Sequence, residues 1–140
     1  MVKILEDNKI YFDFSCEPGR FLKEGDNLVS DWRGAPESHY RMSYNNRCKP
    51  GDSRVWEIPV GTSKGKYLYF EKSNMAELEK ITLDLKERSV ENRGDLVVSV
   101  LSHTYEYESP ETIRGIEEKL LLLKKYGTFI NLNELEKFLS

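Results

Sequence analysis

The strongest hydrophobic feature of the chain is a nearly continuous apolar run over residues 96–101, interrupted only by Ser99. The run follows a turn-forming Asn-Arg-Gly segment at 92–94. A short apolar run bounded by turn residues is typical of a strand that is buried on both faces, as in parallel sheets and barrels. We therefore expect residues 96–101 to form such a strand.

Helical periodicity appears on both sides of this run. Before it, Asn74 and Glu77 have the spacing of a capping box, and an apolar stripe follows at helical intervals, formed by Met75, Leu78, Ile81 and Leu85. After it, Ser109 precedes Pro110, an arrangement that favours a helix start, and Gly127 is a suitable end. The buried face of that second helix is expected to comprise Ile113, Ile116, Leu120 and Leu123, widened by Leu121 and Leu122.

A third helix is predicted at the end of the chain. Asn131 and Glu134 repeat the capping-box spacing. The apolar face of this helix is expected to comprise Leu132, Leu135, Phe138 and Leu139. The three residues 128–130 are too few for more than an edge or closing strand.

Three further strands are predicted earlier in the chain. Residues 9–15 alternate apolar and polar side chains, residues 54–60 are rich in strand-forming types, and residues 67–70 are aromatic. Pro59 is expected at the end of its strand or at a bulge, because proline cannot donate to a ladder.

Between the first two strands, residues 16–53 show no convincing periodicity. Glycine, proline and asparagine interrupt them repeatedly, yet they also carry Trp32, Tyr40, Met42 and Tyr44. Long irregular loops in compact domains are usually functional or disordered, and this composition does not resemble a disordered linker. We expect an ordered lid or groove-forming loop without regular strands.

The order of the predicted elements indicates an α/β fold. Its second half alternates strand and helix, which favours mainly parallel strands in a sheet or barrel. Three or four strands are too few for a complete parallel sheet, since buried parallel strands need neighbours on both sides. Residues 1–140 are therefore expected to form a single but incomplete α/β domain.

Composition excludes several classes of protein. The 140 residues carry a net charge of −3, and no basic stripe with aromatics is present, which argues against nucleic acid as a partner. No apolar run approaches the roughly 20 residues of a membrane span. Acidic residues stand where a signal peptide would have its apolar core, so a cytoplasmic location is the default expectation.

The two cysteines, Cys16 and Cys48, do not have the spacing of metal ligands. They could form a disulfide across the long loop in an oxidising compartment. Because no signal peptide is predicted, two free thiols are the favoured interpretation.

His103 is the leading candidate for chemistry, since it follows the predicted buried strand and imidazole titrates near neutrality. A histidine that only forms structural hydrogen bonds is the commoner case, and Glu106 could orient it or be solvated. Asp31 and Trp32 in the long loop could bind a sugar-like ligand, although Trp32 could equally anchor the loop on the core. Tyr40 is a weaker candidate.

Several segments resemble, in order, the later part of the polysaccharide deacetylases, or carbohydrate esterase family 4. Residues 98–106, Val-Ser-Val-Leu-Ser-His-Thr-Tyr-Glu, are similar to the family's last histidine motif. The other similar segments are Phe-Asp-Phe-Ser-Cys-Glu-Pro-Gly at 12–19, Asp-Trp-Arg-Gly-Ala-Pro at 31–36, Trp-Glu-Ile-Pro-Val at 56–60, and residues 120–135.

The resemblance implies a distorted β/α barrel and an enzyme that uses a divalent metal such as zinc to remove acetyl groups from sugars. In that mechanism an aspartate is the base and a histidine is the acid. By matching, His103 would be the acid and Leu101 would line the acetyl pocket. Asp31 and Trp32 would shape the groove for an acetylated carbohydrate.

This chain lacks the family's earlier Asp-Asp, His-x-x-x-His and Arg motifs, and therefore its catalytic base and metal ligands. It resembles the C-terminal half of the domain and should be inactive alone. A separate N-terminal half, or self-association through an open sheet edge, would then complete it. Two alternatives are a non-catalytic carbohydrate-binding or interaction module, with Trp32, Tyr40 and Tyr105 lining a sugar groove, and an α/β domain with only a superficial likeness.

Overall fold

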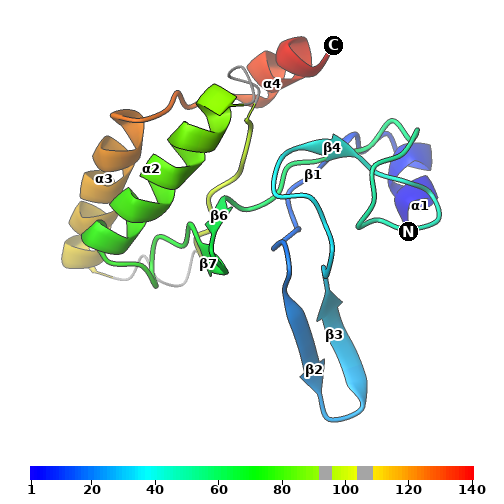
Figure 1. Ribbon diagram of the computed structural model, residues 1–140, viewed down its shortest axis with the longest axis horizontal. Coiled ribbons are helices and arrows are strands. Elements are labelled where there is room, and N and C mark those ends of the chain that lie inside the picture. The colour runs from blue at the N-terminus through cyan, green and yellow to red at the C-terminus, as the bar shows by residue number, and fades with distance from the viewer. Residues whose placement is uncertain (92–95, 104–108) are drawn as a thin grey trace.

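The computed structural model describes residues 1–91, 96–103 and 109–140. This part of the chain forms four helices and three small open sheets, and the sheets do not close into a barrel (Figure 1). The elements are α1 (Val2–Asp7), β1 (Phe12–Asp13), β2 (Phe21–Glu24), β3 (Asn27–Asp31), β4 (Tyr40–Arg41), β5 (Trp56–Glu57), β6 (Thr62–Ser63), β7 (Lys66–Tyr67), α2 (Met75–Glu91), α3 (Pro110–Lys124) and α4 (Leu132–Leu139). The predicted mixture of helices and strands is confirmed.

Most of the described strand pairs are antiparallel, contrary to the expected mainly parallel arrangement. β1 and β5 form a parallel pair, whereas β4 pairs with β5, β3 with β2 and β7 with β6 in the antiparallel sense. Parallel contact continues only as isolated bridges, from Val60 to Ser99 and from Tyr69 to Leu101. The strands predicted at 9–15 and 54–60 are present but each is shorter than expected, whereas 67–70 contributes only Tyr67 to β7 and Tyr69 to an isolated bridge.

Residues 96–101 do not form the buried strand that the apolar run predicts. All six are half-buried, and they pair only through the bridges at Ser99 and Leu101. The backbone groups of these two residues bond toward 59–61 and 68–70, so the segment is paired along one edge. A segment that is paired along one edge only keeps part of its surface exposed to solvent, whereas a central strand of a parallel sheet is covered on both sides.

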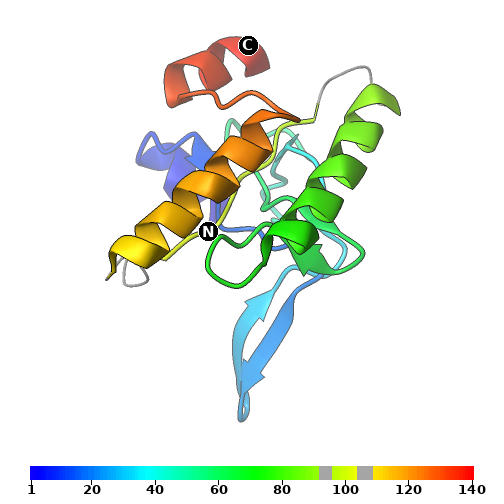
Figure 2. The same cartoon turned by 90° about the vertical axis from the view of Figure 1, so that its left-hand side faces the viewer.

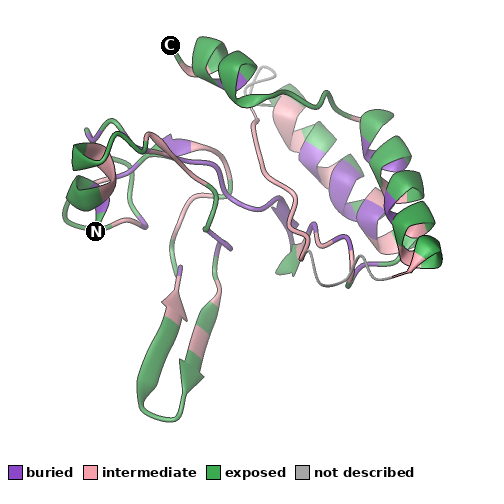
Figure 3. Cartoon of the chain, turned by 180° about the vertical axis from the view of Figure 1, so that it is seen from behind, coloured by how far each residue is buried: buried purple, intermediate pink, exposed green. Residues whose placement is uncertain are grey.

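The long loop at 16–53 contains regular strands, so the expectation of a loop without strands is wrong. β2 and β3 form a hairpin that turns at Gly25 and Asp26, and β4 joins the sheet of β5. The hairpin is exposed along most of its length (Figure 3). A hairpin with no buried face has no apolar alternation, which is why periodicity failed to reveal it.

The predicted helix starts are confirmed. The Asn74 side chain accepts a hydrogen bond from the Glu77 backbone N–H at 2.9 Å, and the Ser109 hydroxyl accepts one from Thr112 at 3.1 Å. Asn131 and Glu134 form the predicted capping box. The predicted faces of the last two helices are only partly buried, since Ile113, Leu120, Leu121, Leu132 and Phe138 are exposed.

The main hydrophobic core lies between α2 and α3, which run side by side in both views (Figures 1 and 2). Its buried members are Leu68, Phe70, Leu78, Ile81, Leu85, Ile116, Leu122 and Leu123. Leu96, Val98 and Val100 pack against this core. Two smaller clusters lie around Val55 and around Trp32, so the long segment before residue 54 has its own packing.

Replacing Leu78 with alanine is expected to lower the free energy of unfolding by about 3 kcal/mol, because it leaves a cavity in a packed core. Leu78 is fully buried within the α2–α3 core. Chemical denaturation measures the change. Leu83 on the same helix is exposed and supplies the control, since Leu83→Ala should cost little. Equal losses from both variants would contradict the placement of the core.

Candidate functional site

The candidate site forms where the segment 96–103 meets the chain that follows β7. Leu101 donates its backbone N–H to the Leu68 carbonyl and accepts from the Phe70 N–H, both at 3.0 Å. These two bonds hold the segments in parallel, so the residues that follow them lie at the same edge. Glu71 and His103 are brought together in this way.

Nδ1 of His103 is hydrogen-bonded to Oε1 of Glu71. The Glu71 side chain is only 5% exposed, whereas that of His103 is 36% exposed. Oε2 of Glu71 is also buried and has no hydrogen-bond partner among the described residues. The carboxyl group of Glu71 is thus buried, whereas the imidazole of His103 is partly exposed to solvent.

This pairing assigns the tautomer of the histidine. A carboxylate only accepts hydrogen bonds, so Nδ1 must carry the proton that Glu71 accepts. The proton that the ring exchanges with other groups is then carried by Nε2. A carboxyl group bonded to one ring nitrogen fixes the orientation of an imidazole, as the aspartate of a catalytic triad does.

Glu71 was not among the residues singled out from the sequence. It directly follows the predicted aromatic strand at 67–70, and His103 follows the predicted strand at 96–101. The carboxyl ends of neighbouring parallel strands meet at one edge of a sheet. By that rule, Glu71 and His103 are expected to lie close together once residues 67–70 and 96–101 are known to be neighbours.

The remaining predicted site residues are divided between two regions. Leu101 lies beside His103 and is half-buried. Trp32 and Tyr40 belong to clusters in the earlier part of the chain, and the contacts described for them include neither His103 nor Leu101. Tyr105 and Glu106 lie outside the described residues.

Trp32 and Tyr40 are mostly covered by protein. Trp32 is 3% exposed, packs with Cys16 and Cys48, and has the Arg47 guanidinium 3.9 Å from its ring centre. Tyr40 donates its hydroxyl proton to the Arg47 carbonyl at 2.7 Å. Both aromatic residues therefore stabilise the packing of the region around residues 16–53. The two cysteines are buried free thiols.

Asp31 ends β3 and is fixed by Arg33. Two charge-assisted bonds join its carboxylate to the guanidinium, at 2.9 and 2.7 Å. The hydrogen bonds from Arg33 lower the pKa of Asp31 to about 2. Asp31 is therefore negatively charged at all ordinary pH values, and the adjacent Arg33 guanidinium balances its charge.

The described residues do not fit a divalent metal. Among residues 1–91, 96–103 and 109–140, no three histidine, cysteine, aspartate or glutamate side chains lie close enough to hold one. A catalytic zinc site usually needs three protein ligands.

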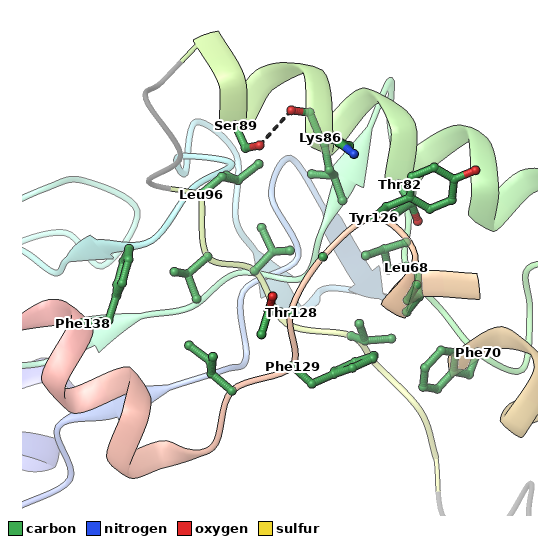
Figure 4. A pocket seen from close by; sticks show the side chains of 17 residues that line it. Leu68, Phe70, Thr82, Lys86, Ser89, Leu96, Tyr126, Thr128, Phe129 and Phe138 are labelled. Atoms are coloured by element: carbon green, nitrogen blue, oxygen red, sulfur yellow. Dashed lines mark hydrogen bonds between the residues drawn. The ribbon is translucent and has the colours of Figure 1, made fainter. Parts of the chain in front are cut away.

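An apolar cavity of about 650 Å³ lies on the inner side of α2 (Figure 4). Leu96, Tyr126, Phe129 and Phe138 line it from three segments of the chain, and Lys86 is its charged member. Its size falls within the ~300–1,000 Å³ of ligand pockets. Neither His103 nor Glu71 lines it, so the cavity and the histidine–glutamate pair are separate features.

Within the described part of the chain, no helix is both long enough and apolar enough to cross a membrane. Comparison of the chain with family models, with curated proteins and with solved structures finds no match.

Proposed function

We propose that this chain is the C-terminal part of a polysaccharide deacetylase-like hydrolase, which removes acetyl groups from amino sugars. The observation that carries the proposal is the pairing of His103 with the buried Glu71 carboxyl group at the end of a parallel-bridged segment. By the resemblance of residues 98–106 to the last histidine motif of the polysaccharide deacetylases, His103 corresponds to the catalytic acid. The parallel bridges also support the finer proposal of a partial β/α barrel.

The path of the chain from β5 to residue 101 supports a barrel-like unit. Val60 follows β5 and pairs in parallel with Ser99 after the chain has passed through α2. β1 pairs in parallel with β5 on the preceding side. The stretch from β5 through α2 to Ser99 therefore has the strand, helix and parallel-strand order of one β/α unit.

In the proposed reaction, His103 supplies a proton to the leaving nitrogen of the acetylated sugar. Nε2 of the imidazolium carries that proton, and Glu71 holds the ring through Nδ1. Protonating the nitrogen converts it into a neutral leaving group when the bond to the acetyl carbon breaks.

The partner that we propose is a separate N-terminal half, which would supply the base and the metal ligands. Exposed apolar residues support a missing partner, because Phe14 beside β1 and Phe129 and Ile130 before α4 are all exposed. The apolar cavity beside α2 is a further surface that such a half could cover. Contiguous exposed apolar surface usually marks an interaction site.

The coding DNA upstream of Met1 tests this proposal. We expect an in-frame or frameshifted segment that encodes Thr-Phe-Asp-Asp and His-x-x-x-His motifs. An upstream region without either motif, in all three reading frames, would count against a split deacetylase.

Zinc titration of the chain alone gives an independent prediction. We expect no tight stoichiometric binding in calorimetry, because the described residues offer no group of three ligands. The same titration after addition of the N-terminal half should show one bound zinc ion. Tight binding by the chain alone would mean that it carries its own metal site.

A non-catalytic carbohydrate-binding module is the second candidate from the sequence, and the structure favours it less. Such a module needs aromatic faces that a sugar can reach, whereas Trp32 and Tyr40 are buried, and Tyr105, its third aromatic residue, lies outside the described residues.

A further inference from the structure

The apolar cavity on the inner side of α2 reaches from the hydrophobic core to the surface. Its lining includes buried core residues, among them Leu68, Phe70 and Leu123. It also includes exposed residues of the segment before α4, where Phe129 is 50% and Ile130 41% exposed. Water in contact with this apolar lining is unfavourable, so an apolar group that fills the cavity gains free energy.

One charged side chain belongs to the described lining of this cavity, and it is Lys86 on α2. The Lys86 Nζ atom lies 5.9 Å from the ring centre of Tyr126, another lining residue, which places the ammonium group at the cavity wall. Within the described part of the chain, the lysines that form ion pairs are Lys3 and Lys66, so Lys86 has no carboxylate partner there. Lys86 is exposed, and its charge is therefore accessible to an anion from solvent.

The hydroxyl groups around Lys86 are already engaged within the protein. Thr82 and Ser89 each donate to a backbone carbonyl of α2, both at 2.7 Å. The Tyr126 hydroxyl donates to the Glu79 carboxylate at 2.6 Å. A ligand with many polar groups, such as a sugar or a peptide strand, would lose hydrogen bonds to water that these side chains do not replace. The lining therefore favours a ligand that is apolar except for one anionic group.

We propose that this cavity binds a fatty carboxylate with a single hydrocarbon chain. Its carboxylate would pair with the Lys86 ammonium, which donates charge-assisted hydrogen bonds. Its tail would extend from α2 toward Phe70 and Phe129, which lie on the opposite side of the cavity (Figure 4). A hydrocarbon tail needs no hydrogen-bond partner, and it covers apolar side chains that are now exposed.

This site is separate from the proposed deacetylase site. His103 and Glu71 are not among the residues that line the cavity. The proposed substrate of His103 is an acetylated sugar, whose hydroxyl groups the cavity does not match. The fatty carboxylate is therefore a second ligand of the chain and not the substrate of the proposed reaction.

Isothermal titration of the purified chain with dodecanoate, kept below its micelle concentration, tests the proposal. We expect one molecule bound per chain, with a negative heat-capacity change from burial of apolar surface. The dissociation constant should fall by roughly fourfold for each methylene added from decanoate to tetradecanoate. Dodecanol should bind more weakly than dodecanoate, and dodecyltrimethylammonium most weakly, because its charge is repelled by Lys86.

Two variants separate the head-group contact from the tail contact. Lys86→Met keeps a long apolar side chain, and should raise the dissociation constant of dodecanoate by roughly fivefold while leaving that of dodecanol unchanged. Lys80→Met is its control, since Lys80 is exposed on the same helix but does not line the cavity. Phe129→Ala should weaken both ligands by roughly fivefold. Phe14→Ala is its control, because Phe14 is similarly exposed and lies outside the lining.

Several outcomes would overturn the proposal. They are no saturable binding of dodecanoate, equal affinity for dodecanoate and dodecyltrimethylammonium, or wild-type affinity in Lys86→Met and Phe129→Ala that circular dichroism shows to be folded. Absence of binding, combined with a self-association that Phe129→Ala abolishes in sedimentation velocity, would assign the cavity to a second copy of the chain instead. These measurements involve no acetylated sugar, metal or N-terminal half, so their result is independent of the proposed deacetylase function.

Discussion

Replacing Glu57 with glutamine is expected to flatten the dependence of stability on pH between about pH 4.5 and about pH 8. Glu57 lies on β5 and is fully buried, and its Oε1 accepts the Cys16 backbone N–H at 3.1 Å. Its Oε2 is buried without a partner among the described residues. Burial, and next to it the charge of Asp13, raise the pKa of Glu57 from 4.5 to about 8.

The sign of the effect follows from proton uptake. Between pH 4.5 and pH 8 the folded protein keeps a proton on Glu57, whereas the unfolded chain releases it. Stability therefore falls as the pH rises through this interval, by up to about 1.4 kcal/mol per pH unit. Below pH 4.5 both states are protonated, and above about pH 8 both are charged, so the contribution becomes constant.

Glutamine imitates the protonated acid because it keeps an acceptor for Cys16 and cannot ionise. The measurement is the free energy of unfolding by denaturant at pH 5, 6, 7 and 8. Glu57→Gln should lose less stability across this series than the wild type, and should be the more stable of the two at pH 8. The exposed Glu87 provides the control, since Glu87→Gln should follow the wild type. Equal slopes for all three proteins would contradict a buried neutral Glu57.

The helices were the part of the fold that local sequence could predict. Asn74, Ser109 and Asn131 each cap a helix through a side-chain bond to a residue two or three positions later, so the signal lies within one turn. Burial of a helix face depends on distant neighbours instead. Ile113 has helical spacing but is exposed, because the described chain brings no element over it.

The strands were harder to predict because their pairing is distant or exposed. Ser99 pairs with residues near Val60 across the whole of α2, and no local pattern reports such a contact. β3 has no buried face, so its apolar residues do not alternate with polar ones. In both cases the prediction inferred burial from the local pattern of apolar residues, whereas burial depends on tertiary contacts.

The candidate site was predicted only in part for the same reason. His103 was found because it follows a conspicuous apolar run. Glu71 was missed because its pairing with His103 depends on the bonds between Leu101 and the residues beside Glu71. Trp32 and Tyr40 were chosen for their chemistry, but whether an aromatic residue is buried is decided by its surroundings, here Arg47 and the cysteines.

The second large effect concerns His103 and the proposed acid role. Replacing His103 with alanine, in the chain joined to the N-terminal half that we propose, is expected to lower kcat/KM for acetate release by roughly 10²–10⁴-fold. The loss arises because the proposed reaction assigns to His103 the proton that the leaving nitrogen accepts. His39 is the matched control, since its described contacts are with Trp56, Phe138 and the Val97 N–H and do not include Glu71.

The rate of acetate release from an acetylated amino sugar is therefore the most direct measurement of the proposed function. The joined, zinc-loaded protein should release acetate, His39→Ala should retain most of that activity, and His103→Ala should lose nearly all of it while remaining folded. Undiminished acetate release by folded His103→Ala, or none by the joined wild-type protein, would contradict the assignment of this chain to a deacetylase.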